Sequence, residues 1–557
     1  MRHTKRRNYR MLTLAASLAV AASYQAVAQT AFVPNDPYFS PDDSRPGWVQ
    51  SQTYLKDINI EGAWNKGITG QGVTIAIISD GLETTHPDLA PNYVAADSWD
   101  FAGNDSVPDP VGDYDRRGTA SAGMAAARGG NGIGVAGAAP YASLAGLRID
   151  DQADFVAATL YHSSGSNKNI DIKVHDYVPG SKVFQNSPAA TAALKESVAA
   201  GTIHVVGAGN GRVFKNGYYG DSNKYDFLNE SGVITVAGLN GSEPSDSSSY
   251  GSNVFVAASA GGLTFASPDG GYAYKGGLVT TDRTGSLGYG WWDEPNQMYT
   301  ETITDYTNDV YGTSSAAAIV GGVLALVKEV QPNLNTRFAK HLIVRTSDGG
   351  FDPDKGFGMI HASKLVSAAT QYAGVTELIT EKTEGLVNES IPDLGTFATA
   401  EFTLETTAAP LEDILVTLTL AHEYAGNIEA YLTSPSGTRT RLMAAGFEDY
   451  PYLPHDLEWT LLANAFWGEK GAGVWKLELT DITSDNDSGK WLSFGIEAHF
   501  GDLVSVPETG TTMLLAVSGI VFLMRRRPPH LDLASQETAE SFFSLILPTK
   551  KTSNDAC

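Results

Sequence analysis

Two polar residues stand at the ends of apolar segments, at places where proteins often do chemistry. Ser314 comes after Gly312 and Thr313 and opens a long apolar segment predicted as a helix over 314–330. The partial positive charge of a helix N-terminus favours negative charge that develops beside such a hydroxyl. Asn210 lies in a Gly-Asn-Gly turn after another apolar segment, and its amide can donate hydrogen bonds. Both residues also have plain structural roles, since serine often caps helices and asparagine suits tight turns.

The elements that must position these residues follow an α/β pattern from about residue 53 to 369. Short apolar segments such as VTIAII (73–78) and TIHVVGA (202–208) alternate with alanine-rich segments such as AATAALKESVAAG (189–201). Strands that are apolar on both faces indicate a mostly parallel sheet covered by helices. Active sites of such folds lie beyond the carboxyl ends of the strands, which directs attention to the residues after 78 and 208.

A different pattern begins near residue 391. Alternating segments such as DILVTLTL (413–420) and VWKLELTD (474–481) are separated by Gly, Pro, Ser and Asn turns. This pattern predicts an antiparallel β-sandwich. We therefore expect an α/β domain over 29–372, a linker over 373–390 and a sandwich domain over 391–502.

Charge and cysteine content limit the partners and the compartment. The formal net charge is −25, which disfavours nucleic-acid binding and favours cations, Ca²⁺ above all. The one cysteine, Cys557, stands at the end of the chain, so neither an internal disulfide nor a cysteine-based metal site is expected. The sequence does not indicate an oligomeric state.

Both ends of the chain carry export signals. A basic segment, an apolar segment and Ala26-Val27-Ala28 form a signal peptide over 1–28. Residues 503–527 include a Pro-Glu turn, an apolar segment and an arginine cluster, similar to the PEP-CTERM sorting signals of Gram-negative bacteria. We expect export through the inner membrane, transient membrane contact through this segment and a cell-surface or extracellular location. A plain single-pass anchor is the alternative, and residues 528–557 have no assigned role.

The ordered motifs resemble one protein family. YLKDINIEGAWNKGITGQGVTIAIISDGLETTHPDL (54–89), NGIGVAGAAPYASLAGLRI (131–149) and YGTSSAAAIVGGVLALVKEVQPNL (311–334) are similar to the kexin/furin branch of the subtilisin-like serine proteases. YLTSPSGTRTRL (431–442) and AFWGEKGAGVWKLELTD (465–481) resemble the P (Homo B) domain of that branch. The resemblance implies a subtilisin-like sheet followed by a jelly-roll-like P domain, and descent from serine endopeptidases.

The resemblance implies that two catalytic positions are intact and two are changed. Ser314 matches the nucleophile, and Asn210 matches the amide that donates to the tetrahedral intermediate. Ser79 stands where the family has the Asp that orients the histidine, and Asp80 beside it should point away. Arg117 stands at the histidine position, and a guanidinium can neither accept nor release a proton there.

The strand that binds substrate in the family is changed as well. The usual Ser-Trp-Gly-Pro is Asp176-Tyr177-Val178-Pro179, and Ser181 replaces an acid of the members that cut at basic residues. Dibasic specificity is therefore not supported. We hypothesise that Arg117 and Asp176 form a charge-assisted pair that fills the old cleft. The alternative is that both side chains point to solvent.

Other histidines are weak candidates for the missing base. His86 belongs to a motif that the family has in any case, His175 should face away from the cleft by strand alternation, and His204 lies within a buried strand.

The resemblance also implies a structural Ca²⁺ site. Asp36, Asp88 and Asn131 match its side-chain ligands, and the backbone carbonyls of Ile133 and Val135 would complete an oxygen cage. Ordinary loop acids and an Asn turn are the alternative.

The leading hypothesis is an exported pseudoprotease that binds peptide, protein or a surface polymer through the cleft or the P domain. The alternative is an active serine endopeptidase with a rearranged site that uses Ser314. A third alternative is a protein without a selected role.

Overall fold

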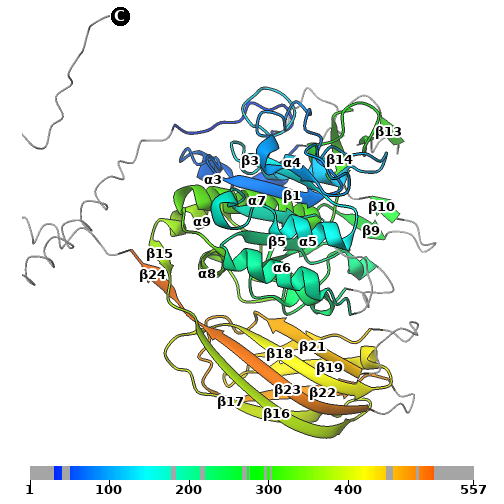
Figure 1. Cartoon of the computed structure of the whole chain (residues 1–557), viewed down its shortest axis with the longest axis vertical. Coiled ribbons are helices and arrows are strands. Elements are labelled where there is room, and N and C mark those ends of the chain that lie inside the picture. Colours follow the sequence, from blue (N-terminus) through cyan, green and yellow to red (C-terminus); the bar gives the residue numbers. More distant parts are fainter. Residues whose placement is uncertain are drawn as a thin grey trace, which may run out of the picture. The chain divides into compact units, whose positions relative to one another are not determined.

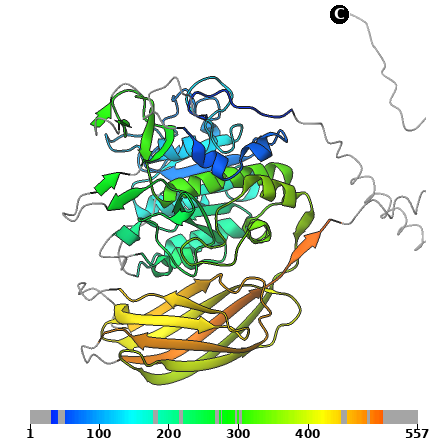
Figure 2. The same cartoon turned by 180° about the vertical axis from the view of Figure 1, so that it is seen from behind.

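The computed structural model describes residues 30–40, 51–176, 184–213, 220–265, 272–274, 276–293, 298–300, 304–446, 456–483 and 489–506. Residues 1–505 belong to one compact unit, which holds an α/β domain and a β-sandwich (Figures 1 and 2). The predicted signal peptide, almost all of the predicted sorting segment and residues 528–557 lie outside the described residues.

A mostly parallel sheet forms the centre of the α/β domain, as the apolar segments predicted. Its strands follow the order β2-β3-β1-β4-β5-β6-β7, and β8 pairs with β6. Only the short β7 runs antiparallel to its neighbour. The strands are β1 (Thr74–Ser79), β2 (Trp99–Asp100), β3 (Ser143–Arg148), β4 (Ile172–His175), β5 (Ile203–Gly207), β6 (Val233–Asn240), β7 (Glu243–Pro244) and β8 (Val256–Ser259).

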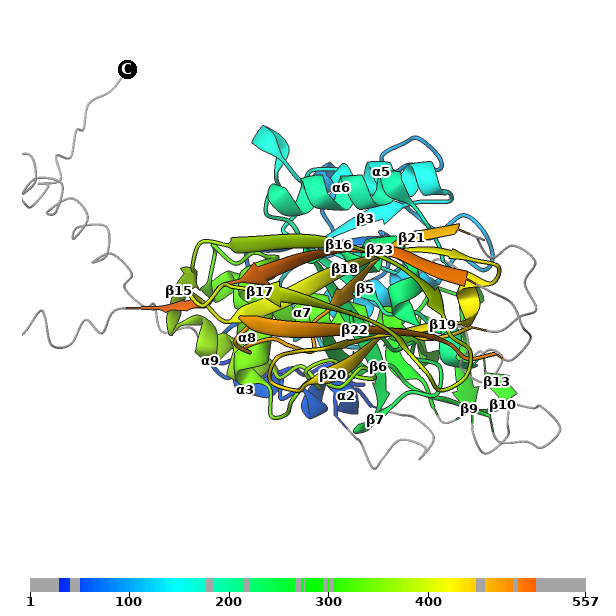
Figure 3. The same cartoon turned by 90° about the horizontal axis from the view of Figure 1, so that it is seen from below.

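Helices cover both faces of this sheet, so successive residues of one strand enter different cores. On β1, Ile75 and Ile77 pack into the core that includes α4 and α7, whereas Ala76 and Ile78 pack with α5 and α6. Helices α5 and α6 lie side by side (Figure 3). The helices are α2 (Thr53–Asp57), α3 (Glu61–Trp64), α4 (Arg117–Ala126), α5 (Gln152–Leu160), α6 (Pro188–Ala199), α7 (Thr313–Val330), α8 (Thr336–Thr346) and α9 (Ala362–Ala369).

Helix α7 passes through the middle of the domain and carries Ser314 at its start. Within the described residues it is the helix with the length and apolar character of a membrane span, but 78% of it is buried inside the domain. Its hydrophobicity therefore reflects its place in the core of the α/β domain.

Short hairpins decorate the α/β domain. Strands β11 and β14 pair antiparallel, and the chain between them forms the β12–β13 hairpin. The strands are β9 (Leu263–Phe265), β10 (Tyr272–Tyr274), β11 (Leu278–Thr281), β12 (Trp291–Asp293), β13 (Met298–Thr300) and β14 (Tyr306–Val310). Short 3₁₀ helices lie at Ala95–Asp97, Gly165–Asn167, Gly211–Val213, Ser222–Lys224, Asp226–Asn229 and Ala425–Asn427.

The second domain is the predicted antiparallel sandwich. Its two sheets have the orders β16-β23-β18-β21 and β17-β22-β19-β20. On β18, Ile414, Val416, Leu418 and Leu420 are all buried, in keeping with the alternation seen in the sequence. The strands are β16 (Ile379–Ile391), β17 (Ala398–Leu404), β18 (Leu411–His422), β19 (Ile428–Thr433), β20 (Arg439–Met443), β21 (Asp456–Ala463), β22 (Gly473–Asp481) and β23 (Gly489–Phe500).

The linker predicted over 373–390 is wrong, because most of it forms strands. β15 (Tyr372–Val375) pairs with β24 (Leu503–Ser505), and β16 pairs with β23 at the edge of a sandwich sheet. Every residue of β16 except Ile391 is at least partly exposed, so its polar composition resembles that of a loop. The pairing of β24 also corrects the predicted start of the sorting segment at residue 503.

Buried polar contacts join the two domains. Arg337 of α8 donates to the Glu412 carboxylate through Nε at 2.7 Å and Nη2 at 2.5 Å, and His341 Nε2 lies 2.8 Å from the same carboxylate. Glu412 is only 2% exposed. Trp459 Nε1 of the sandwich donates to the backbone oxygen of Asn223 at 2.8 Å. A buried carboxylate held by two partners resists separation of the domains.

Candidate functional site

Ser314 and Asn210, which we call the nucleophile half, are held together by the start of α7. The Asn210 side-chain oxygen accepts from Thr313 N at 3.0 Å, and Thr313 Oγ1 accepts from Gly209 N at 3.0 Å. Asn210 is exposed, and its Nδ2 has no hydrogen-bond partner among the described residues. The nucleophile half thus presents a hydroxyl and a free amide donor beside a helix N-terminus, as acyl transfer requires.

A glycine makes this approach possible. Gly312, directly before α7, has φ 113°, and a Cβ at this residue would lie 3.0 Å from Asn210 Nδ2. A side chain at this position would therefore be strained and would press on the amide.

Ser79, Asp176 and Arg117 form what we call the relay half. Ser79 ends β1, Asp176 directly follows β4, and the two strands are parallel neighbours with Ile78 paired to His175. Their carboxyl ends therefore bring Ser79 and Asp176 together, although 97 residues separate them. Ser79 Oγ donates to Asp176 Oδ2 at 2.8 Å, and both residues are 3% exposed.

Asp176 is a buried carboxyl between two hydroxyls. Burial raises its pKa to about 6, and Asp80 raises it too, whereas Arg117 and hydrogen bonding by Ser79 and Ser314 lower it. Its Oδ1 has no partner with well-formed hydrogen-bond geometry among the described residues. The Ser314 hydroxyl is therefore near the carboxyl without a tight bond to it, and Asp176 has unused capacity to accept a proton.

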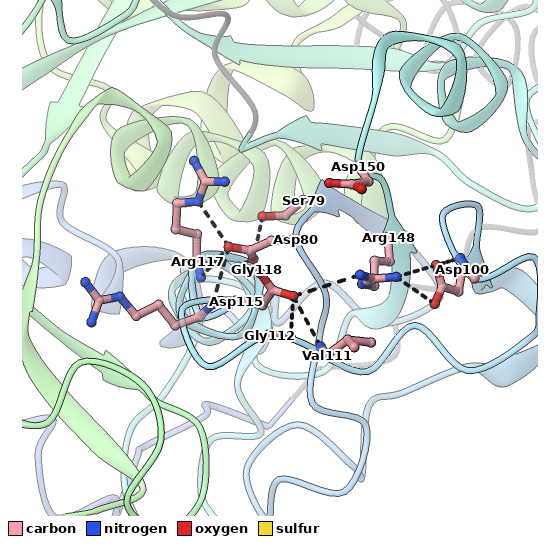
Figure 4. A network of polar contacts seen from close by, with 12 residues as sticks. Ser79, Asp80, Asp100, Val111, Gly112, Asp115, Arg117, Gly118, Arg148 and Asp150 are labelled. Atoms are coloured by element: carbon pink, nitrogen blue, oxygen red, sulfur yellow. Dashed lines mark hydrogen bonds and ion pairs between the residues drawn. The ribbon is translucent and has the colours of Figure 1, made fainter.

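Arg117 makes its ion pair with Asp80 rather than with Asp176. Arg117 Nε lies 3.1 Å from Asp80 Oδ2, and the Arg117 side chain is 50% exposed (Figure 4). No ion pair joins Arg117 to Asp176 among these described contacts, so the predicted direct pair is wrong. Burial lowers the pKa of Arg117, but the carboxylates of Asp176 and Asp80 outweigh it and raise the pKa. Asp176 thus acts on the guanidinium through space.

Asp80 has turned toward the start of α4, as strand alternation predicted. Its carboxylate accepts from the backbone N–H groups of Arg116 at 3.3 Å, Arg117 at 3.3 Å and Gly118 at 2.9 Å. A carboxylate that caps three free amides at a helix N-terminus is well stabilised. Asp80 therefore fixes the position of α4, and with it Arg117, and it also accepts from Ser79 Oγ at 3.2 Å.

The loop before α4 is held by a second polar cluster (Figure 4). Arg148 Nη1 donates to Asp100 at 3.0 Å, and its Nη2 lies 3.9 Å from Asp115. Asp115 in turn accepts from the backbone N–H of Gly112 at 2.7 Å. These contacts tie the end of β3 to the residues that lead into Arg117.

Sequence reasoning missed one residue of the site, Tyr289. Burial raises the pKa of Tyr289, and the Asp176 carboxylate is the largest charge contribution to that increase, so the phenol lies in the field of Asp176. Asp282 Oδ2 accepts from Tyr289 N at 2.7 Å, and the Arg116 guanidinium lies 4.0 Å from the centre of the Tyr289 ring. The signal in the sequence was Gly288-Tyr289-Gly290, a turn soon after the acid Asp282.

The candidate histidines have partners elsewhere. His175 Nε2 and His204 Nδ1 are 2.8 Å apart in a fully buried pair, and burial lowers the pKa of His175 to about 3. His86 Nε2 lies 2.9 Å from the backbone oxygen of Asp305. None of these three imidazoles contacts Ser314 in the described contacts. Of the predicted substrate strand, Asp176 is described, and Tyr177, Val178 and Pro179 lie outside the described residues.

The residues predicted for Ca²⁺ do come together. Asp36 and Asp88 are 4% and 0% exposed, and burial followed by their mutual repulsion raises the pKa of Asp36. Asn131 Nδ2 donates to Asp88 Oδ1 at 2.7 Å, and Gly130 N donates to Asp36 Oδ2 at 2.8 Å.

Two backbone oxygens near these acids fit a cation. The carbonyls of Ile133 and Val135 accept no hydrogen bond from the described residues. In the described part of the chain, neither buried carboxylate pairs with a lysine or an arginine. Two such carboxylates next to unused carbonyl oxygens suit a hard cation such as Ca²⁺. The donor set is therefore compatible with the predicted ion.

Comparisons with known families match both domains of the chain. The subtilase family model matches residues 70–360, more than half of the chain, and the proprotein convertase P-domain model matches residues 411–498. The chain belongs to the subtilase family. The P domain and the furin-like relatives described next place this subtilase in the kexin/furin branch.

The relatives share sequence with both domains. The subtilase is 28% identical over 496 residues to Furin-1 of Xenopus laevis, covering 83% of this chain and 58% of that protein. It is 29% identical over 467 residues to Proprotein convertase subtilisin/kexin type 6 of Rattus norvegicus, covering 77% of this chain and 46% of that protein. The chain thus spans about half the length of these relatives.

A solved structure shows the same fold. The serine protease of Aeromonas sobria superimposes with a TM-score of 0.68 at 23% identity, covering 80% of this subtilase and 91% of that chain. The fold predicted from the sequence, a subtilisin-like sheet followed by a β-sandwich, is therefore confirmed. The chain is a homologue of serine endopeptidases.

Proposed function

We propose that this subtilase is an exported pseudoprotease, which binds peptide segments in its cleft and does not turn them over at the rate of an active protease. The observation that carries the proposal is Arg117. It stands at the position of the family's general base, and its guanidinium is engaged with Asp80. A guanidinium has no lone pair with which to take the proton of Ser314.

The size of this loss favours binding over hydrolysis. Removal of the triad histidine from a subtilase lowers kcat by about 2 × 10⁶, or ~8.6 kcal/mol. The retained amide of Asn210 stabilises only the oxyanion, which leaves a small residual rate. Ser79 at the orienting position adds to the loss, since it cannot hold an imidazolium as a carboxylate does.

Turnover and binding, measured separately, test the proposal. The purified chain is incubated with casein and with a fluorogenic peptide library, and peptide binding is measured by fluorescence anisotropy. We expect saturable peptide binding in both the wild type and Ser314→Ala, and turnover near the buffer rate in both. Rapid casein cleavage that Ser314→Ala abolishes would contradict the proposal.

A second candidate, an active serine endopeptidase with a rearranged site, is favoured by one observation. The Asp176 carboxyl lies against the hydroxyls of Ser79 and Ser314 and has a pKa of about 6. A base with a pKa near the working pH is well matched to general base catalysis. The Ser314-dependent cleavage described above would favour this candidate.

A structural role for Ca²⁺ belongs to the same proposal. Asp36, Asp88 and Asn131, with the carbonyls of Ile133 and Val135, would hold the ion. The bound cation would neutralise two buried carboxylates and stabilise the folded state, without any part in proton transfer.

Export and surface location rest on the sequence. The signal peptide over 1–28 and the PEP-CTERM-like segment within 503–527 support export by a Gram-negative bacterium and sorting to its surface. A peptide, a protein or a cell-surface polymer would then be the partner. Fractionation of cells that express the full chain, followed by mass spectrometry of the mature termini, tests the location and both cleavages.

A further inference from the structure

We infer that Asp176 is the proton acceptor of Ser314, so that the nucleophile keeps a slow reactivity toward acylating and phosphonylating reagents. The inference rests on the proposed function in one respect: no imidazole of the described residues contacts Ser314. It goes further because it assigns a base to a site that lacks the family's base.

Asp176 is held on the Ser79 side of the site, with one carboxyl oxygen left over for the Ser314 hydroxyl. Its Oδ2 is fixed by the Ser79 hydroxyl at 2.8 Å, and its backbone N–H donates to the oxygen of Ile78 at 3.1 Å. The other carboxyl oxygen, Oδ1, is buried and has no well-formed bond in the described part of the chain, while Ser314 contributes hydrogen bonding to the carboxyl. A catalytic hydrogen bond is often long in a ligand-free site and shortens when substrate binds.

Charge balance explains why three substitutions occur together. A neutral imidazole that takes a proton becomes a cation, and it needs a carboxylate to hold that charge. A carboxylate that takes a proton becomes neutral, so it needs hydroxyl donors to hold the starting anion. Ser79 is such a donor, whereas an Asp at this position would repel Asp176. The cation of Arg117 supports the anion through its charge, without an ion pair between the two side chains in the described contacts.

Among the described residues, the groups that act on Asp176 come from four parts of the fold. Asp80 after β1 raises its pKa, and Arg117 on α4 lowers it. Ser79 and Ser314, on β1 and α7, lower it by hydrogen bonding. Tyr289 faces it from the loop before β12 and stays neutral, because burial and Asp176 raise the phenol pKa.

The step that tests this role uses a fluorophosphonate. The Ser314 oxygen forms a bond to phosphorus, the phosphorus–fluorine bond breaks and fluoride leaves with its electron pair. Asp176 takes the proton of the hydroxyl, and the Asn210 amide donates to the phosphoryl oxygen. Atoms and charge balance: the site loses the charge of Asp176 and fluoride carries it away.

The experiment measures the rate of Ser314 labelling by a fluorophosphonate probe on the full mature chain from pH 4.5 to 9. We expect the wild-type rate to rise with pH, with a midpoint near 6, and to level off above the midpoint, because Asp176 must be ionised. Asp176→Asn should lower the plateau at least about 100-fold. Asn210→Ala, the matched variant of the other half, should lower the rate but keep the midpoint.

Thermal unfolding of each variant shows whether it folds. If Asp176→Asn does not fold, the wild-type pH profile still decides the matter. Absence of labelling at every pH, a rate that climbs to pH 9 without levelling, or an unchanged rate in folded Asp176→Asn would each overturn the inference while leaving the pseudoprotease proposal intact. Fast casein turnover that depends on both Ser314 and Asp176 would support the inference and overturn that proposal.

Discussion

The cleft and the predicted calcium site, which we call the calcium-type loop and which contains Asp36, Asp88 and Asn131, both bury carboxylates. The two regions surround these carboxylates with different partners. In the cleft, Asp176 interacts with the hydroxyls of Ser79 and Ser314 and with the charge of Arg117. In the loop, Asp36 and Asp88 meet backbone amides, an Asn side chain and each other.

This difference separates two uses of a buried acid. An acid held by hydroxyls that can exchange protons is suited to proton transfer. Two acids that repel each other, with unused carbonyl oxygens beside them, are suited to a metal ion. The surroundings of each carboxyl, more than its burial, indicate its use.

The strongest way to break the comparison is to rebuild the triad in the cleft. The variant Ser79→Asp, Arg117→His, Asp176→Ser restores the residue types that the family has at these positions. We expect kcat/KM for a peptide substrate to rise by about 10³-fold or more, because an oriented imidazole returns to Ser314. The control adds Ser314→Ala to the triple variant, which should remove the gain. A triple variant that folds and gains nothing would show that the loss of function extends beyond the relay half.

Metal removal tests the loop. With Ca²⁺ at 100 times its Kd, a chelator should lower the free energy of unfolding by about 3 kcal/mol. Asp88→Asn should remove this response. Asp100→Asn, a matched buried acid that pairs with Arg148 at 3.0 Å, should lose stability but keep the response. Calorimetry with and without calcium measures both. If calcium stabilises Asp88→Asn as much as it stabilises the wild type, the calcium-type loop is not the binding site.

The pH dependence of stability, measured with a chelator present, tests the same carboxylates. Burial raises the pKa of Asp36 and Asp88, so the folded chain binds more protons than the unfolded chain. Their contribution to stability is therefore fully present below the unfolded pKa and is lost as pH rises through the raised values. We expect bound calcium to reduce this loss of stability. We expect Asp36→Asn to reduce the loss even without calcium. Denaturant unfolding at several pH values measures both. The opposite slope would contradict the assignment.

Ser79→Ala tests the hydroxyl that holds Asp176. A hydrogen bond to a charged group contributes about 1.4 kcal/mol, so its loss should raise the Asp176 pKa by about one unit. The midpoint of Ser314 labelling should therefore move from about 6 toward higher pH. Ser79→Thr keeps the hydroxyl and should keep the midpoint. A midpoint that moves to lower pH in Ser79→Ala would contradict the role of this bond.

Arg117→Gln should give the smallest effect. The side chain is 50% exposed, so solvent and salt screen its charge. Its removal should raise the midpoint by about half a pH unit, and the difference should shrink further in high salt. An unchanged plateau rate at high pH would agree with a purely electrostatic role. A large loss of rate would instead make Arg117 part of the reaction.

Local sequence patterns were enough to predict most of the fold. The apolar segments of β1 and β5, the long helix α7 and the alternation of β18 each carry their structure in consecutive residues. The edge strand β16 was missed because its half-exposed residues carry a loop-like composition. A local sequence pattern does not reveal a strand that depends on its pairing with β23, which is far away in the chain.

The sequence by itself determined the family, the intact Ser314 and Asn210, and the absence of His and Asp from their usual positions, because each of these is a matter of residue type in an ordered motif. Only the tertiary structure decided what Arg117 and Asp176 do. Arg117 forms an ion pair with Asp80 instead of the expected Asp176, and Asp176 accepts a hydrogen bond from Ser79 across two parallel strands. Such contacts join residues far apart in the chain, and their geometry depends on the packing of the whole sheet.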